Sequence, residues 1–225
     1  MPLSRPSLPL PPLDANVAAR LTAAERAIAA TYRHAQRRDE WVIARLLAKD
    51  LLRERLCDRI DDQDVSILPD RVTGRPQLIG TEPELHTRLQ PLDISITHAG
   101  RHVAVAIASD ERVGVDLVRP GDIQSDRLRP WFTPAEQTIA EAESLTLADL
   151  WAMKEAAYKA TSGQRPFRPA DYPVTAERGW TCGHCGVLLQ LVGELTIAIA
   201  CPDRTLLREA DRLWFARRRL SSAMS

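Results

Sequence analysis

Two short segments combine carboxylates and a lysine in a pattern that suits chemistry at a phosphate. In GVDLV, residues 114–118, a single carboxylate, Asp116, stands in an apolar, strand-like run. Aspartate is uncommon in strands and costly to bury unpaired, so this position requires a partner. In WAMKEAAYKA, residues 151–160, the side chains of Trp151, Glu155 and Lys159 recur every four residues and share one face of a predicted helix.

An aspartate on a strand and a glutamate on a helix can meet at one hard cation. Mg²⁺ prefers one or two carboxylates, completed by waters and phosphate oxygens. Lys159 lies one helical turn beyond Glu155 and would then face a phosphate. Glu155 and Lys159 alone are also typical of a modest surface ion pair, so the metal-site hypothesis depends on both segments together.

A basic stripe lies earlier in the chain. Arg38, Arg45, Lys49 and Arg53 fall within one sector of a helix that the apolar spacing predicts over residues 39–60. Such a stripe is typical of a solvated helix face. It could also bind a phosphate, because guanidinium groups donate paired hydrogen bonds to phosphate oxygens. These residues alone leave both interpretations open.

The elements that must position these side chains alternate between helices and close-set strands. Capping patterns and apolar periodicity predict helices over residues 22–33, 39–60, 133–143 and 146–163. Extended runs predict strands over 92–100, 102–109, 112–118, 173–176, 186–193 and 194–202, and a hairpin turn at 73–76. The run 102–109 is apolar on both faces, which indicates a buried central strand. Residues 212–225 have no assigned role.

Composition excludes several classes of partner. The formal net charge is zero, so no overall attraction to nucleic acid or to an anionic membrane is expected. The longest apolar stretches are too interrupted to span a membrane, and the N-terminal segment lacks the continuous apolar run of a signal peptide. We therefore expect a cytoplasmic protein, with neither nucleic acid nor membrane as a partner.

The segment WTCGHCG, residues 180–186, resembles redox and zinc motifs. A zinc site could use Cys182, His184 and Cys185 of this segment together with Cys201. A redox motif requires a helix after the first cysteine, whereas a hairpin is predicted here, and no second pair of ligands follows. We favour a turn with reduced thiols, with a zinc or redox site as the alternative.

GVDL, followed about forty residues later by WxMKEAxxK, resembles the 4′-phosphopantetheinyl transferase superfamily, in its longer, surfactin-type, pseudo-dimeric group. TGRP (73–76), SITHAG (95–100) and RRDEWVIARLLAK (37–49) are lesser matches, and the resemblance extends from about Thr22 to Ala200. It implies an α+β fold of two similar halves related by a pseudo-twofold axis, each a small, mainly antiparallel sheet on a long helix. We place an extended N-terminal arm at residues 1–17, the N-terminal half at 18–111 and the C-terminal half at 112–225.

The resemblance also implies an activity. Such enzymes transfer the 4′-phosphopantetheine arm of coenzyme A to a serine of an acyl or peptidyl carrier protein, and release adenosine 3′,5′-bisphosphate. Coenzyme A binds in the cleft between the halves, and one chain suffices to build the site, so we expect a monomer. A non-catalytic relative that binds coenzyme A and carrier proteins is the alternative.

Residue roles follow from the matching motifs. Asp116 and Glu155 would hold Mg²⁺, with Mn²⁺ possible, and Glu155 would accept the proton of the carrier serine. Lys159 would stabilise the departing phosphate. The coenzyme A contacts implied near the ribose 3′-phosphate are Arg75, His98 and Arg45, with Arg38 and Lys49 beside them; for His98 a purely structural role is the alternative.

The chain departs from the family pattern at two places. Many relatives have a second acid two residues after the aspartate, on the same side of the strand, where this chain has Val118. The Ser-His-Ser-like strand end has Thr97 and Ala99 around His98. We therefore expect a site of two carboxylates, completed by waters and oxygens of coenzyme A.

Overall fold

The computed structural model describes residues 13–56, 60–161, 166–176, 179–204, 207 and 213–219, and its helices and strands alternate as in an α+β protein. The first elements in chain order are α1 (Ala15–Ala19), α2 (Ala23–Ala29), α3 (Ala35–Leu56), β1 (Val65–Pro69), β2 (Pro76–Gly80), α4 (Pro83–Leu89), β3 (Leu92–Ala99) and β4 (His102–Ser109). They are followed by β5 (Gly114–Val118), α5 (Ser125–Leu128), α6 (Pro134–Ala142), α7 (Leu147–Thr161), β6 (Val174–Thr175), β7 (Thr181–Cys182), β8 (Cys185–Val192), β9 (Leu195–Cys201) and β10 (Leu213–Arg219), with three single-turn 3₁₀ helices between them.

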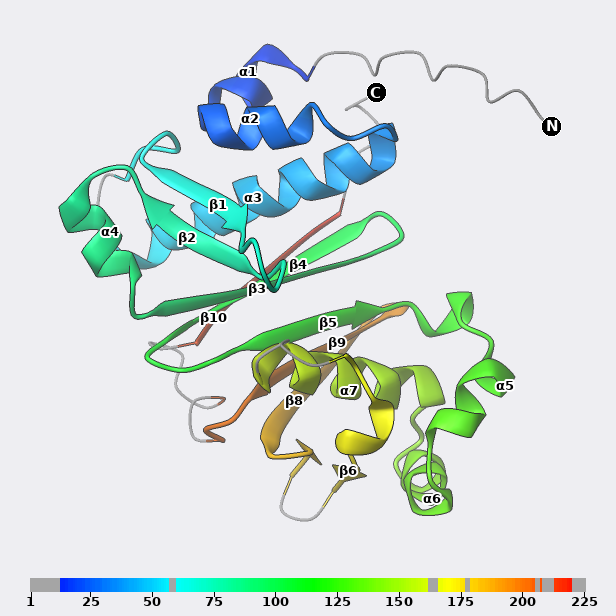
Figure 1. The fold of residues 1–225 in the computed structure, drawn as a ribbon. Helices are drawn as coiled ribbons and strands as arrows, with labels where there is room; N and C mark the ends of the chain where they lie inside the picture. The colour runs from blue at the N-terminus through cyan, green and yellow to red at the C-terminus, as the bar shows by residue number, and fades with distance from the viewer. Residues whose placement is uncertain are drawn as a thin grey trace, which may run out of the picture.

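Within the described residues, the strand pairs are antiparallel and form three small sheets. Their strand orders are β1-β2, β10-β4-β3 and β5-β9-β8-β7-β6. Four layers stack in Figure 1: α3, the sheet of β3 and β4, the sheet of β5 and β9, and α7. Separate apolar clusters fill the three spaces between these layers. The predicted α+β class with small antiparallel sheets is thus confirmed.

The sequence of β4 explains why the two sheets lie face to face. Side chains alternate across a strand, so Val103, Val105 and Ile107 pack toward α3. The intervening alanines, 104, 106 and 108, pack against β5 and β9. Small side chains on this face let the second sheet approach closely. The prediction of a buried central strand over 102–109 is confirmed, because β4 lies between β10 and β3 and its six middle residues are buried.

Helix starts agree with the capping patterns. Thr22 and Glu25 form the capping box of α2, and Thr133 and Glu136 form that of α6, with Pro134 in the first turn. Two other helix bounds differ from the prediction. α2 stops at Ala29, whereas the first helix was predicted to reach residue 33, and α3 begins at Ala35, whereas the second was predicted from residue 39. The hairpin predicted at the Gly-Arg-Pro turn is present as β1 and β2.

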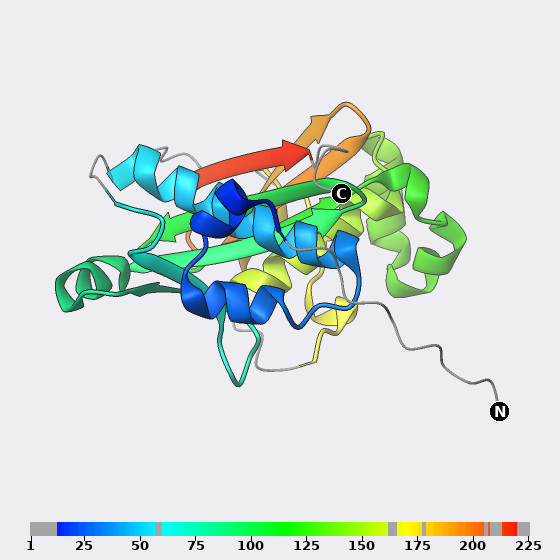
Figure 2. The ribbon, with the colours of Figure 1, turned by 90° about the horizontal axis from the view of Figure 1, so that it is seen from above.

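The ends of the chain differ from the predicted division. α1 begins at Ala15, with Asp14 as its N-cap, so the last residues of the arm assigned to 1–17 are helical; residues 1–12 lie outside the described part of the chain. β10 pairs with β4, as Figure 2 shows, although residues 112–225 were assigned to the other half. A strand pairs with whichever sheet edge it reaches, and that edge can be distant in sequence.

The cysteine segment forms a tight turn. Cys182 and Cys185 face each other across β7 and β8, with Gly183 in the left-handed region at φ 57°. The thiols of Cys182, Cys185 and Cys201 are free and buried, and burial raises their pKa values, to about 11 for Cys185 and about 12 for Cys201. Within the described residues, no group of three or more His, Cys, Asp or Glu side chains could hold a metal ion. These observations favour the turn with reduced thiols.

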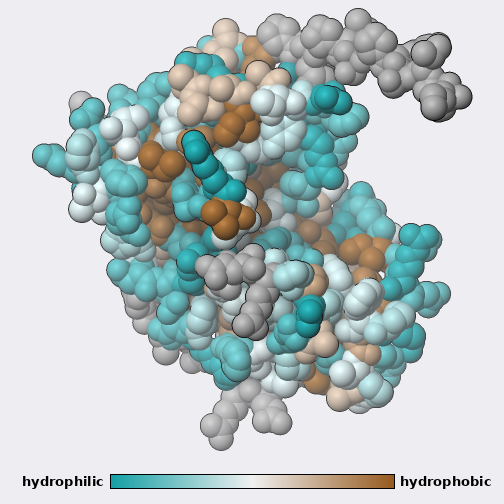
Figure 3. Space-filling model, viewed as in Figure 1, coloured by the Kyte–Doolittle hydropathy of each residue, from teal (hydrophilic) through white to brown (hydrophobic). Residues whose placement is uncertain are grey.

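Hydrophilic side chains cover most of the face shown in Figure 3, and hydrophobic ones reach it in several separate places. Among the helices that the structure describes, none has the length and apolarity needed to cross a membrane.

Candidate functional site

A close contact between β5 and α7 creates the candidate site. Gly114, Asp116 and Val118 alternate along β5 and share the side that faces α7. A Cβ atom on Gly114 would lie 1.9 Å from the carbonyl oxygen of Ala156 and 2.6 Å from the amide nitrogen of Ala160. Glycine at this position, opposite small residues of α7, therefore lets the helix backbone touch the strand.

Asp116 is the centre of the contact. Its residue is 7% exposed, and its Oδ1 atom accepts hydrogen bonds from Lys159 Nζ at 2.5 Å and from the Thr97 hydroxyl at 3.0 Å. Lys159 Nζ also donates to the Val115 carbonyl at 3.2 Å. Three elements, β3, β5 and α7, thus meet at one carboxylate. The partner that a buried Asp116 required is Lys159.

Glu155 lies on the same side of α7, one turn before Lys159. Burial raises the pKa of its carboxyl group; Lys159 lowers that pKa, and the negative charge of Asp116 raises it further, with a net upward shift. The charges of Lys159 and Asp116 therefore both act on Glu155. Two neighbouring carboxylates of like charge suit Mg²⁺, which takes one or two protein carboxylates with waters and phosphate oxygens.

The position of the missing second acid is part of the core. Val118 is 5% exposed and packs in the cluster that lies between the sheet and α7. It shares a face of β5 with Asp116 but lies two residues further on, at the C-terminal end of the strand. The carboxylate pair available here is therefore Asp116 and Glu155, and the valine replaces an acid with an apolar contact to the helix.

Polar side chains on β3 join the two central layers. Asp93, Ser95 and Thr97 alternate along β3 and point toward β5. Asp93 accepts a hydrogen bond from the Val113 amide at 2.8 Å, and Ser95 accepts one from the Val115 amide at 3.0 Å. With the Thr97–Asp116 bond, these contacts fix the strand that carries the carboxylate.

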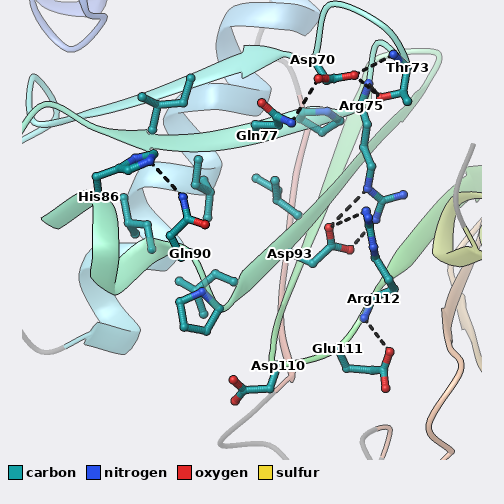
Figure 4. Close-up of a pocket in the computed structure, with 17 residues that line it drawn as sticks. Asp70, Thr73, Arg75, Gln77, His86, Gln90, Asp93, Asp110, Glu111 and Arg112 are labelled. Atoms are coloured by element: carbon teal, nitrogen blue, oxygen red, sulfur yellow. Dashed lines mark hydrogen bonds and ion pairs between the residues drawn. The ribbon is translucent and has the colours of Figure 1, made fainter. Parts of the chain in front are cut away.

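Arg75 links the β1–β2 hairpin to the same centre. Its guanidinium forms an ion pair with Asp93, and donates to the Val113 carbonyl at 2.8 Å and to the Lys159 carbonyl near the end of α7. Figure 4 shows Arg75 reaching Asp93 at one end of a cavity of about 710 Å³ between β2, α4 and β3. Arg75 therefore holds the backbone of α7 in place from the opposite half.

His98 lies elsewhere. Asp93 and Thr97 are four residues apart on β3, which corresponds to about 13 Å, so Arg75 and His98 stand at opposite ends of the strand. His98 lines a hollow of about 170 Å³ together with Thr97 and Arg45. Thr97 also binds Asp116, but its side chain points to the β5 side of β3, whereas His98 and Arg45 lie on the α3 side, so β3 stands between this hollow and the carboxylate site.

Arg45 is the deepest cation in the hollow. Its guanidinium lies 3.9 Å from the ring centroid of Trp41, and it donates to the carbonyl oxygens of Ile67 and Trp41. Burial lowers its pKa to about 10. A guanidinium held in a partly desolvated hollow is a strong site for an anion.

The structure gives the other residues of the basic stripe different surroundings. Lys49 is 3% exposed and binds Glu25 at 2.6 Å and two backbone carbonyls, which is a structural arrangement. Arg38 is 5% exposed and lies 3.2 Å from Asp39. The residue that sequence reasoning missed is Arg37, whose guanidinium lies 2.8 Å from His98 Nε2. Its neighbour Arg38 was named instead, since the helix start at Ala35 and the position of His98 were unknown.

Comparison with models of protein families gives a match. Residues 112–179 match the model of the 4′-phosphopantetheinyl transferase superfamily. This segment is similar to that superfamily. It covers less than a third of the 225 residues but contains Asp116, Glu155 and Lys159. Among the curated proteins, none matches the chain.

Proposed function

We propose that this protein is a 4′-phosphopantetheinyl transferase of the longer, surfactin-type group, acting on an acyl or peptidyl carrier protein. The observation that carries the proposal is the ion pair of Asp116 and Lys159 at the contact between β5 and α7, with Glu155 one turn earlier on α7 and under the electrostatic influence of both. The segment that matches the superfamily is the one that contains these three residues. The basic hollow lined by Arg37, Arg45 and His98, on the α3 side of β3, supports a second anion site for coenzyme A.

Coenzyme A carries a pyrophosphate and a ribose 3′-phosphate, so two anion sites are needed. Arg45, Arg37 and His98 would contact the 3′-phosphate. Asp116 and Glu155 would hold Mg²⁺, which would neutralise charge on the pyrophosphate when bound. Lys159 would reach the phosphate oxygens after exchanging part of its contact with Asp116. Lys49 and Arg38 are left out of this proposal because each lies beside a carboxylate, Glu25 and Asp39, that already balances its charge.

The reaction is a displacement at the β-phosphorus. The carrier serine Oγ forms a bond to that phosphorus, and the bond to the oxygen of the 5′-phosphate breaks, so adenosine 3′,5′-bisphosphate leaves. Glu155 would take the serine proton, directly or through a water, and its raised pKa improves it as a base. Lys159 would stabilise the charge that develops on the leaving phosphate.

Arg75 has a supporting role in this scheme. The resemblance implies a contact with coenzyme A, whereas the guanidinium contacts Asp93 and the carbonyl oxygens of Val113 and Lys159. These contacts favour a role in holding Lys159 against Asp116.

The deciding experiment is intact-mass spectrometry of an apo carrier protein incubated with this protein, coenzyme A and Mg²⁺. We expect a mass gain of one phosphopantetheine that is absent without Mg²⁺ and much slower with the Asp116→Asn variant. The alternative is a non-catalytic relative that binds coenzyme A and carriers; Val118 in place of an acid favours it. Tight coenzyme A binding with no mass gain across acyl and peptidyl carriers would reject the transferase and support this alternative.

A further inference from the structure

A buried carboxylate lies behind the exposed part of the basic hollow. Glu40 of α3 is 4% exposed, although it faces a site rich in cations. Its Oε1 atom accepts a hydrogen bond from Gln36 at 2.8 Å. Its Oε2 atom lies 3.4 Å from Arg37 Nη1 and 3.8 Å from His98 Nδ1. Glu40 thus contacts both side chains that would meet a phosphate at the mouth of the hollow.

The contact between Arg37 and His98 fixes the form of the imidazole ring. A guanidinium only donates hydrogen bonds, so His98 Nε2, 2.8 Å from Arg37 Nη1, must accept. The ring proton is then on Nδ1, which faces Glu40. In this arrangement Arg37 is bound to Nε2 of the ring.

Arg37, Glu40 and His98 also separate two hollows. They line both the 170 Å³ hollow that contains Arg45 and a second, more open one of about 740 Å³. The titratable and charged groups around both hollows are Tyr32, Arg33, His34, Arg37, Glu40, Arg45 and His98. An anion that enters between the hollows meets a predominantly basic surface and competes with His98 for Arg37.

We propose that Glu40 is the positioning residue of this anion site: it aligns Arg37 and His98, and it stabilises the doubly protonated ring once a phosphate has replaced His98 as the partner of Arg37. The added proton comes from solvent, and the ring then carries a proton on both nitrogens, with Nδ1 toward Glu40 and Nε2 toward the phosphate. Histidine is the side chain suited to such a charge change near neutral pH. This inference rests on the proposed function for the identity of the phosphate, the ribose 3′-phosphate of coenzyme A.

The charge of Glu40 has two opposing effects on phosphate binding. A carboxylate repels a phosphate directly, so Glu40 helps only if it acts through the ring and the guanidinium. Removal of its charge should weaken binding if Glu40 positions the site, and should strengthen binding if repulsion dominates.

The experiment is ¹⁵N NMR of the histidine rings at pH 7.5, with His98→Gln to assign the His98 signals among the five histidines. In the wild-type protein, the His98 signals should show Nδ1–H alone, and both nitrogens should become protonated on titration with inorganic phosphate. Glu40→Gln should reduce this change and weaken phosphate binding by about tenfold or more. The exposed Glu54→Gln on the same helix is the charge-matched control and should leave both unchanged.

Unchanged or tighter phosphate binding in Glu40→Gln, or a neutral ring in the phosphate-bound wild type, would overturn the proposal. Coenzyme A and its analogue without the 3′-phosphate then identify the source of the anion: only the former should protonate His98. The phosphate titration needs no transferase activity. A protein that shows the phosphate response but neither binds coenzyme A nor modifies any carrier would reject the proposed function and retain the anion site.

Discussion

The region around α3 and the region around α7 each contain a buried lysine–glutamate ion pair in a similar setting. Lys49 of α3 binds Glu25 at 2.6 Å, and Lys154 of α7 binds Glu136 at 2.6 Å. Each glutamate caps the helix that precedes the long one, and each also accepts a hydrogen bond from a strand amide. The strand amides are those of Ile67 for Glu25, at 2.9 Å, and Val174 for Glu136, at 3.0 Å.

The halves differ in what surrounds this pair. In α7, Glu155 directly follows Lys154 and faces Asp116 with Lys159. In α3, Arg45 precedes Lys49 by one turn and faces the hollow. The buried pair therefore has a structural role in both regions. Beside it, the α7 region has the carboxylates of the candidate site, and the α3 region has the cations of the hollow. In the dipeptide Lys154-Glu155, the lysine stabilises the fold and the glutamate is available for chemistry.

The largest expected effect comes from removing one buried lysine. Lys154→Met leaves the Glu136 carboxylate, 3% exposed, without its cation, and should lower the free energy of unfolding by about 3–5 kcal/mol. Lys49→Met should have a similar effect through Glu25. Urea unfolding followed by circular dichroism measures both, with Met at the exposed Arg127 as control. A cost below about 1 kcal/mol for either lysine would break the equivalence of the two pairs.

The next prediction separates Glu155 from its neighbour Lys154. Glu155→Gln and Asp116→Asn should each slow transfer by roughly a hundredfold to a thousandfold, as for the loss of a group that stabilises a transition state. Glu155→Gln should barely change the unfolding free energy. Carrier mass gain in single-turnover reactions gives the rate, and exposed Glu143→Gln is the matched control. Near-normal transfer by either variant would remove the carboxylate pair from the mechanism.

A smaller effect tests the contact that brings α7 to β5. Gly114→Ala places a methyl group against the backbone of Ala156 and Ala160 and should cost about 1–3 kcal/mol of unfolding free energy. Transfer should also fall, because the displaced helix separates Lys159 from Asp116. Gly121→Ala meets no atom within 4 Å and is the control. Equal stability and activity of the two variants would show that the close approach is unnecessary.

The smallest effect concerns how acid changes the unfolding free energy through the Lys154–Glu136 pair. Burial raises the pKa of Glu136, but hydrogen bonds from Lys154 and from the Thr133 and Val174 amides outweigh it, so the pKa is lowered. A lowered pKa stabilises the folded state above the ordinary glutamate value of about 4.3, and this contribution is lost as the pH falls through the folded pKa. In Lys154→Met, burial without the cation should raise the pKa, so acid should lower its unfolding free energy less. Urea unfolding of the wild type and of Lys154→Met from pH 6 to 3 measures this difference. If the unfolding free energies of the two proteins fell in parallel with pH, the prediction would be wrong.

Much of the local structure was predictable from the sequence. The capping boxes at Thr22 and Thr133 depend on residues three apart, and the alternation in β4 depends only on strand geometry. That a buried Asp116 needs a partner was expected from the cost of burying an aspartate, but the partner expected was a metal ion shared with Glu155, and the direct contact with Lys159 was not predicted. Arg37 was not predicted, since its importance depends on a histidine that is 61 residues away.

By itself, the sequence determined the elements and the residue types that could do chemistry, because both depend on spacings within one helix or strand. The tertiary structure decided which charges meet. Lys49, Lys154 and Lys159 are all lysines on long helices, yet two are buried beside capping glutamates and one reaches Asp116. Helical periodicity fixes which face a side chain lies on, but the partner it meets there is set by how sheets and helices pack from distant parts of the chain.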